Sequence, residues 1–352
     1  MKYRFAFLFV ALNLINVIDS LAQDTNELDT LKMKGEKHLM NIRMLTSAGE
    51  NAEAYLSFSN QKLIYQSTVG DIKCDQIFIM NIDGSDNKIV STGFGRTTCS
   101  YFLPGDSTIL YASTHLAGKE CPPPPDRSKG YVWKLYDSFD IFFANADGSN
   151  VRRITDAPGY DAEATVSPVG DKIIFTSTRD GDPELYVMNI NGSDQKRLTF
   201  EKGYDGGAFF SQDGKKICFR SSRPKTENEL TDYEDLAKNG MFRPTALEIN
   251  VMDADGKNIR QVTNAGKASF APFFHPDGKR IIFSSNMNSQ NGRNFDLFIV
   301  NIDGTGLEQI TFNETFDGFP MFTSNGKKLV FASNRFNLKQ GDTNIFIADW
   351  VD

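Results

Sequence analysis

The stretch YDAEATVSPVGDKIIFTSTRDGDPELYVMNINGSDQKRLTF, from Tyr160 to Phe200, decides the fold because it recurs along the chain. A second clear copy, KASFAPFFHPDGKRIIFSSNMNSQNGRNFDLFIVNIDGTGLEQITF, runs from Lys267 to Phe312. Each copy holds four short runs rich in β-branched and aromatic residues, separated by Gly, Pro, Asn and Asp, which is typical of strands joined by tight turns. A four-stranded repeat of about 40–50 residues indicates a β-propeller, one blade per repeat.

The third strand of the repeat gives the number of blades. It recurs as IFIMN, IFFAN, LYVMN, INVMD, LFIVN and IFIAD, at Ile77–Asn81, Ile141–Asn145, Leu185–Asn189, Ile249–Asp253, Leu297–Asn301 and Ile345–Asp349. An Asp-Gly or Asn-Gly pair follows five of them, and these pairs accept the positive φ angles of tight hairpin turns. The sequence therefore predicts an all-β fold, a six-bladed β-propeller with four-stranded blades.

The outer strand of the last blade is expected from the N-terminal part of the chain. Fourth strands that end in Thr follow most hairpins, but none follows Ile345–Asp349. Asn41–Thr46 repeats the pattern of the fourth strand Asn258–Thr263 and precedes the first blade. Because an open edge strand invites aggregation, we predict that residues 38–46 complete the last blade. Residues 38–352 would then form one propeller, preceded by a lead-in at 23–37.

The repeat pattern SPDGxxIxFxSxRxGxxxLYVMNxDGxxxxxLT resembles the TolB-type, WD-like propeller repeat of exported bacterial proteins. The resemblance covers nearly all of the chain after the first residues, and it implies the propeller fold. Propellers of this type are similar to those of the Tol–Pal envelope system, prolyl oligopeptidase-type enzymes and oligogalacturonate lyases. Two functions therefore stay open: a non-catalytic binding or scaffold module, and a polysaccharide lyase or hydrolase acting at the channel mouth.

The N-terminus and the composition indicate an exported protein. Lys2 and Arg4 precede the apolar run Phe5–Ile18, and small residues up to Ala22 suit cleavage, so residues 1–22 read as a signal peptide. The net charge of −7 gives no basic surface for nucleic acid, and no later run is long enough to span a membrane. The expected partner is an envelope or extracellular protein, or a glycan, met in the periplasm or outside the cell. We expect a monomer or a component of an envelope complex.

Two blades carry inserts of about 20 residues between their second and third strands, at about 116–136 and 224–245. Both must emerge on the same face of the ring, where loop variation favours recognition. The first insert holds four consecutive prolines and then Tyr131, Trp133 and Tyr136, which would act either as binding anchors or as caps on their own blade. The second insert is acidic and predicts a short helix beginning near Thr231.

The same face collects charged residues at two repeated positions. Carboxylates stand where first strands begin and arginines follow second strands, at Asp161, Glu163, Asp205 and Asp317 and at Arg179, Arg223 and Arg335. They would form either ion pairs that tie neighbouring blades together or a polar rim that contacts a ligand. We predict a binding site at Tyr131, Trp133, Tyr136, Asp161, Arg179, Asp205 and Arg223.

Three of the four cysteines, Cys74, Cys99 and Cys121, also map to the insert-bearing face. In an exported protein this favours a disulfide. We expect Cys99 to pair with Cys121, with Cys74 as the competing partner for either; a zinc site that adds His115 and three free thiols are the alternatives. The histidines are otherwise scattered and no nucleophile motif is present, so we expect no catalytic residue, no metal and no cofactor.

Overall fold

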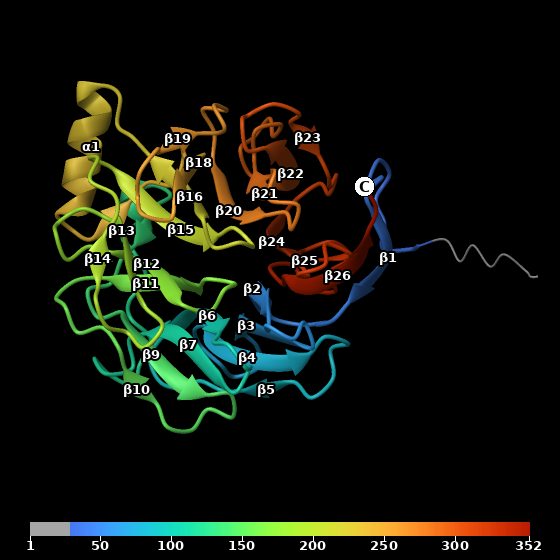
Figure 1. Ribbon diagram of the computed structural model, residues 1–352, viewed down its shortest axis with the longest axis horizontal. Coiled ribbons are helices and arrows are strands. Elements are labelled where there is room, and N and C mark those ends of the chain that lie inside the picture. The colour runs from blue at the N-terminus through green and yellow to red at the C-terminus, as the bar shows by residue number, and fades with distance from the viewer. Residues whose placement is uncertain (1–28) are drawn as a thin grey trace, which may run out of the picture. The chain divides into compact units, whose positions relative to one another are not determined.

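The predicted blades are six antiparallel four-stranded sheets in this computed structural model, which describes residues 29–352. Residues 31–352 form one compact unit, and the predicted signal peptide at 1–22 lies outside the described residues. Figure 1 shows the sheets arranged as a ring, with the first strand of each blade facing the centre. The all-β six-bladed propeller is therefore confirmed.

The first three blades follow the chain from the centre outwards. Blade one comprises β2 (Glu50–Leu56), β3 (Lys62–Thr68), β4 (Gln76–Asn81) and β5 (Lys88–Ile89). Blade two comprises β6 (Thr97–Phe102), β7 (Thr108–Ser113), β9 (Asp140–Asn145) and β10 (Arg152–Arg153). Blade three comprises β11 (Asp161–Val166), β12 (Lys172–Ser177), β13 (Glu184–Asn189) and β14 (Lys196–Arg197).

The last three blades keep this order except at the final outer strand. Blade four comprises β15 (Tyr204–Phe210), β16 (Lys216–Ser222), β18 (Glu248–Asp253) and β19 (Arg260–Gln261). Blade five comprises β20 (Ser269–Phe274), β21 (Arg280–Ser285), β22 (Asp296–Asn301) and β23 (Glu308–Gln309). Blade six comprises β24 (Asp317–Phe322), β25 (Lys328–Ser333), β26 (Asn344–Trp350) and β1 (Leu39–Met44).

The pairing of β1 with β26 closes the ring, as the sequence predicted. Leu39 lies opposite Trp350 and Met44 opposite Phe346 in an antiparallel register. Leu39 and Ile42 are buried in the core that blades five and six share. The edge of β26 is therefore covered rather than open.

The threonine that ends the fourth strands has a common structural role. In blades two to five its hydroxyl accepts a hydrogen bond of 2.9 Å from a backbone N–H of the third strand. Thr46 accepts the same bond from Ile345, also at 2.9 Å, although 299 positions separate the two residues. The segment that precedes blade one is thus the structural equivalent of an ordinary outer strand.

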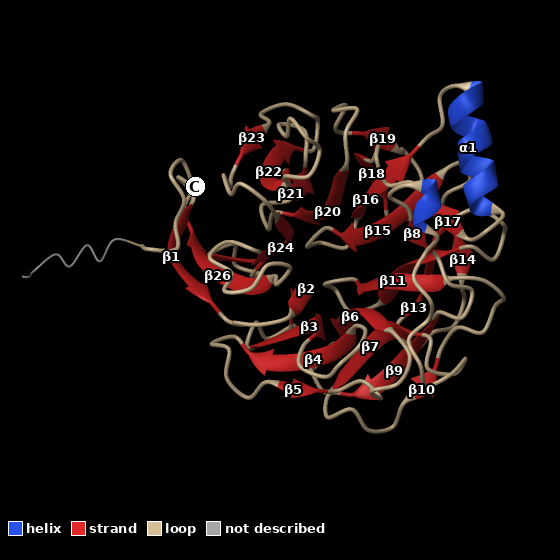
Figure 2. Cartoon of the chain, turned by 180° about the vertical axis from the view of Figure 1, so that it is seen from behind, coloured by secondary structure: helices blue, strands red, loops and turns tan. Residues whose placement is uncertain are grey.

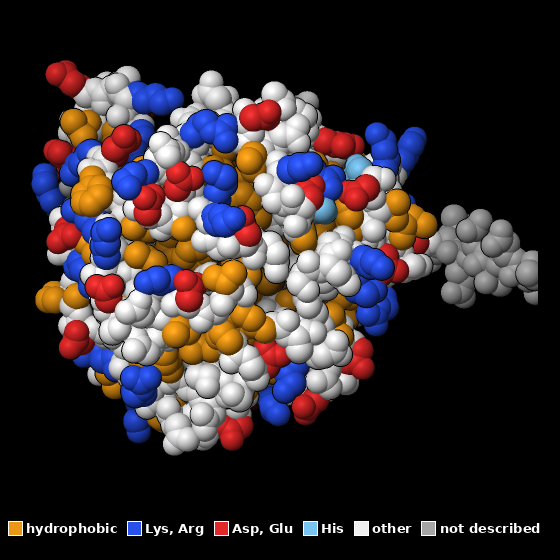
Figure 3. Space-filling view, viewed as in Figure 1, with side chains coloured by type: hydrophobic (Ala, Val, Ile, Leu, Met, Phe, Trp, Pro, Cys, Tyr) orange, Lys and Arg blue, Asp and Glu red, His pale blue; other side chains and the backbone are white. Residues whose placement is uncertain are grey.

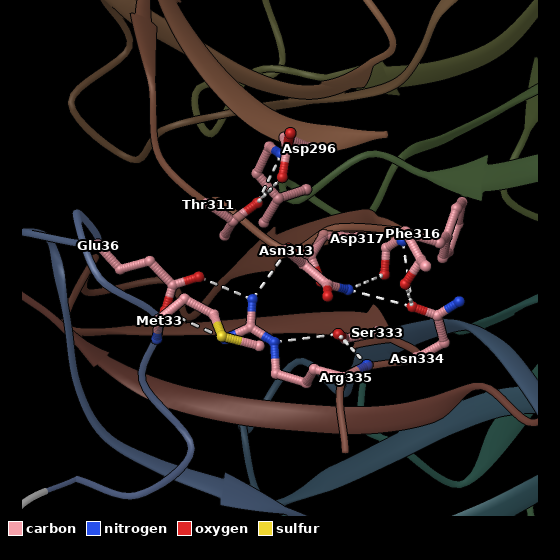
Figure 4. A network of polar contacts seen from close by, with 12 residues as sticks. Met33, Glu36, Asp296, Thr311, Asn313, Phe316, Asp317, Ser333, Asn334 and Arg335 are labelled. Atoms are coloured by element: carbon pink, nitrogen blue, oxygen red, sulfur yellow. Dashed lines mark hydrogen bonds and ion pairs between the residues drawn. The ribbon is translucent and has the colours of Figure 1, made fainter. Parts of the chain in front are cut away.

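A fully buried arginine fixes the lead-in beside this strand. Figure 4 shows Arg335 between Glu36, from the lead-in, and Asp317, at the start of β24. The nearest N···O distances are 2.8 Å to Glu36 and 2.9 Å to Asp317, and none of the three side chains is exposed. A buried guanidinium needs such compensation, because leaving one charge of a buried group unpaired costs about 3–5 kcal/mol.

The two inserts meet on one face of the ring. Helix α1 (Glu227–Ala237) and β17 (Met241–Phe242) come from the blade-four insert, and β8 (Trp133–Lys134) of the blade-two insert pairs with β17. Figure 2 shows β8, β17 and α1 together at one side of the ring. The first insert also contains the short 3₁₀ helix η1 (Arg127–Lys129).

The predicted start of the helix near Thr231 is wrong. Thr226 is the N-cap, and it forms a capping box with Glu229, so the helix begins four residues earlier and Thr231 lies within it. Thr226–Glu229 and Thr231–Glu234 both have the Thr-x-x-Glu spacing of a capping box. This spacing alone therefore does not determine where the helix begins. Among the described residues, no helix is long and apolar enough to cross a membrane.

Removing the residues up to Thr46 should destabilise the propeller. It exposes β26 and leaves the Arg335–Asp317 pair without Glu36, so we expect aggregation or a loss of several kcal/mol in the free energy of unfolding. The measurement is chemical denaturation, with a chain that lacks only the residues up to Thr30 as the control. Equal unfolding midpoints for the two chains would contradict the closure.

Candidate functional site

A bulge in every first strand builds the central channel. The pairing register shifts in the same place in all six blades. The residue at each bulge has a positive φ, and the six that face one another are Glu53, Cys99, Glu163, Gly207, Ala271 and Phe319. The space among them is about 20 Å³, about enough for one water molecule.

Aromatic rings close the channel towards the short-turn face. Two positions after the bulges, Tyr55 and Phe209 meet with ring centroids 5.3 Å apart, and Tyr101 and Phe273 pack against them. A separate hollow of about 280 Å³ lies beyond this plug, beside the short turns. In Figure 3, hydrophobic side chains gather near the middle of the face shown, and charged side chains lie around and between them.

On the insert-bearing face the channel opens into a pocket of about 360 Å³. Its floor includes the bulge residues of blades one to three, and its walls combine aromatic rings with polar and charged side chains. The wall residues include Trp133, Tyr136, Phe139, Tyr160, Phe270 and Phe319. Since the plug blocks the other end, this pocket is a blind site suited to holding a ligand.

Glu163 at the pocket floor is fully satisfied. It forms an ion pair with Arg220 and accepts hydrogen bonds from the Tyr204 hydroxyl at 2.8 Å and the Gly207 amide at 2.8 Å. The Arg220 guanidinium lies over the rings of both Trp133 and Tyr204, 5.1 and 5.5 Å from their centroids. A Cβ atom at Gly207 would lie 2.5 Å from Arg220, so a side chain there would displace the guanidinium.

Glu53, on the same floor, has no such partner. Among the described residues no ion pair joins it to a cation, and its neighbour is the Cys99 thiol, with which it shares a hydrogen bond. Burial raises the pKa of Glu53 to about 7, against a weaker opposing effect from that thiol and Arg220. Burial also raises the pKa of Cys99 well above its usual range, so this thiol stays neutral and unreactive at physiological pH.

The three aromatic residues predicted as a site have different surroundings. Tyr131 is 68% exposed, and its hydroxyl accepts a hydrogen bond of 3.2 Å from the Trp133 indole. Trp133 is partly exposed and packs edge-on against Tyr204 and Phe242. Tyr136 is buried and its hydroxyl donates to the carbonyl of Pro123. Tyr136 is therefore placed as a cap on its own blade, whereas Tyr131 is free to contact a partner.

The predicted aspartates pair with arginines of their own blades, whereas Glu163 of blade three pairs with Arg220 of blade four. Asp161 contacts Arg179 at 2.9 Å in blade three, and Asp205 contacts Arg223 at 2.7 and 2.9 Å in blade four. The two carboxylates are almost fully buried, while the guanidinium groups keep some exposure. The expectation of ion pairs between blades is therefore corrected for the aspartates, because Asp and Arg are 18 positions apart and join the first and second strands of one blade. It holds for Glu163, whose ion pair with Arg220 joins blades three and four.

The favoured Cys99–Cys121 disulfide is wrong; Cys121 pairs with Cys74, the competing partner. Cys99 occupies the bulge of β6, with φ +51°, so its side chain points into the channel instead of towards the insert. Because the disulfide consumes two of the four ligands, the zinc alternative is also excluded. Among residues 29–352 no three His, Cys, Asp or Glu side chains gather as a metal site.

The sequence analysis missed Glu53 and Arg220. Arg220 had a signal: the equivalent second-strand residues are Gln66, Ala112, Thr176, Ser284 and Ala332, all uncharged. Gly207, where the other five first strands have a side chain at the bulge, makes room for it. Glu53 had no comparable signal, because nothing in a strand pattern shows where a bulge falls.

Comparisons with known proteins agree with this architecture. The family model of the Tricorn protease N-terminal beta propeller domain matches residues 135–252. The Tol-Pal system protein TolB of Bordetella pertussis is 51% identical over 47 residues, which is 13% of this chain and only 11% of that relative's length. The chain thus matches about a tenth of the length of this relative.

Solved structures show the same fold at low identity. A putative TolB from Agrobacterium tumefaciens has a TM-score of 0.60 at 17% identity, over 88% of this chain and 94% of that one. TolB from Acinetobacter baumannii has a TM-score of 0.56 at 18% identity, over 86% and 63%. An oligogalacturonate lyase from Vibrio parahaemolyticus has a TM-score of 0.50 at 13% identity, over 88% and 93%.

Peptide mapping without reduction should find Cys74 joined to Cys121, with Cys99 and Cys218 alkylated only after unfolding. The bridge spans 47 positions, for which the chain-entropy relation gives about 4 kcal/mol of stabilisation. Reduction should therefore lower the melting temperature of the wild type, but not that of a Cys74→Ser, Cys121→Ser double variant. Recovery of a Cys99–Cys121 peptide would contradict this geometry.

Proposed function

We propose that this chain, a propeller of TolB-type blades, is a binding or scaffold module without chemistry of its own. It is exported to the periplasm or the cell exterior, where it recognises a protein or a glycan on its insert-bearing face. The observation that carries the proposal is the pairing of β8 with β17. This pairing joins the inserts of blades two and four beside a pocket that is closed at its other end. Variable loops on a rigid scaffold are where recognition is usually found.

The contacts with the partner centre on Tyr131 and Trp133. Both lie on the blade-two insert, and Tyr131 offers an amphipathic ring at the surface that is already oriented by its hydrogen bond with Trp133. Arg179 and Arg223 contribute through the exposed edges of their guanidinium groups. Asp161, Asp205 and Tyr136 act indirectly, because they hold these groups and the insert in place.

The partner is an envelope or extracellular protein, or a glycan, and the propeller meets it as a monomer or as a component of an envelope complex. The name of the curated relative, a Tol-Pal system protein, supports a place in the envelope. The alternative, a polysaccharide lyase or hydrolase, has weaker support. Its solved neighbour shares only the fold at 13% identity, and the described residues offer no cluster of three metal ligands.

Affinity capture from the envelope of the producing cell tests this proposal. Tyr131→Ala should weaken capture by about 2 kcal/mol or more, roughly 30-fold, without changing the melting temperature, since the ring is largely exposed. The matched variant Tyr136→Ala removes a buried ring and should lower stability by about 3 kcal/mol or more. Unchanged capture by Tyr131→Ala, with the fold intact, would place the binding surface elsewhere.

A further inference from the structure

The pocket floor carries a carboxylate, Glu53, that forms no ion pair with any of the described residues. The pocket also contains Glu163, Asp75, Arg220, Arg96 and Lys134. Glu163 is paired with Arg220, and Asp75 lies 3.6 Å from Arg96. Lys134 donates to the carbonyl of Asn239 in the other insert. Among the described residues, Glu53 is thus the pocket anion without an ion pair and Lys134 the pocket cation without one; Arg220, which is paired with Glu163, acts on Glu53 only as a nearby charge.

The surroundings of Glu53 suit an organic cation. The walls of the pocket present aromatic rings, including those of Trp133, Tyr160 and Phe270. Rings beside a carboxylate attract an ammonium group through their negative faces and exclude the water that would otherwise screen the pair. A metal ion would need more oxygen or sulfur ligands than one carboxylate and one neutral thiol provide.

We infer that the pocket binds a primary ammonium group, with Glu53 as its counter-ion and the aromatic wall as its cage. The group comes either from a small free amine or from a lysine side chain of the bound partner. This inference rests on the proposed function only for the second source. Glu53 then contacts the ligand directly, whereas Cys99 and the Glu163–Arg220 pair shape the floor.

Binding of a cation should be linked to ionisation of Glu53. Five titratable or charged groups interact with this carboxyl: Cys99 of β6, Arg220 of β16, Glu163 of β11, Asp75 between β3 and β4, and Tyr55 of its own strand. With a pKa of about 7, Glu53 is about one tenth ionised at pH 6 and nine tenths ionised at pH 8. Since the ammonium prefers the carboxylate, its affinity should rise about tenfold from pH 6 to pH 8, with about half a proton released at pH 7.

The test is isothermal titration calorimetry of the full folded chain with putrescine and with Nα-acetyl-lysine methylamide. We expect binding of at least one amine, the stated rise with pH, and no binding of the Nε-acetylated lysine analogue. Glu53→Gln should weaken binding at least tenfold and keep the melting temperature, because it removes a carboxyl that is costly to ionise. The exposed control Glu314→Gln should bind as the wild type does.

The results separate the two sources and the two proposals. If Glu53→Gln weakens both amine binding and envelope capture, the partner supplies the ammonium; if it weakens amine binding alone, the ligand is a free amine. Absence of amine binding at millimolar concentration, or equal binding by Glu53→Gln, overturns the inference. Capture that depends on Tyr131 would still stand in that case.

Discussion

The structure depends on the closure of a ring, and one buried guanidinium marks the place where it closes. A propeller has no free edge only if its last blade is completed, and here the completing strand lies at the opposite end of the chain from its partner. Arg335 donates hydrogen bonds to two carboxylates, that of Asp317 in its own blade and that of Glu36 in the lead-in. In blades three and four the equivalent arginines pair with the aspartate of their own blade and stay partly exposed. By adding Glu36, the lead-in turns the ion pair found in other blades into a fully buried group of three charges that holds the lead-in against blade six.

The closed ring determines which segments lie together on the insert-bearing face. Each blade places the junction between its second and third strands on the same face, so the two inserts share it although about 100 positions separate them. Val132 of one insert packs with Leu236 and Met241 of the other in a small core of its own. This core supports Trp133 above Arg220, and the aromatic plug below makes the channel a dead end. The geometry thus favours holding a ligand at the mouth over passing one through.

The sequence predicted the ring well and the site only in part, for a physical reason. Repeats record the spacing of strands and turns, which is why the blades, the closing strand and the shared face of the inserts follow from it. The repeat pattern does not predict which side chains of an insert are buried: Tyr136 is buried and Tyr131 is exposed, although both lie on the same insert. The bulges matter most, because they turn Cys99 away from Cys121 and Glu53 into the channel. The pairing of Asp161 with Arg179, by contrast, could have been found from the shared 18-residue spacing of three such pairs.

Native-state hydrogen exchange of β1 tests the central claim most directly, because it asks whether the closing strand opens with the whole ring or before it. If the ring depends on closure, the amides of β1 and of β26 should exchange only through global unfolding, with the same free energy as those of the inner strand β25. If the amides of β1 exchanged several kcal/mol more easily than those of β25, while the rest of the propeller stayed protected, the closing strand would be an accessory and the account would be wrong.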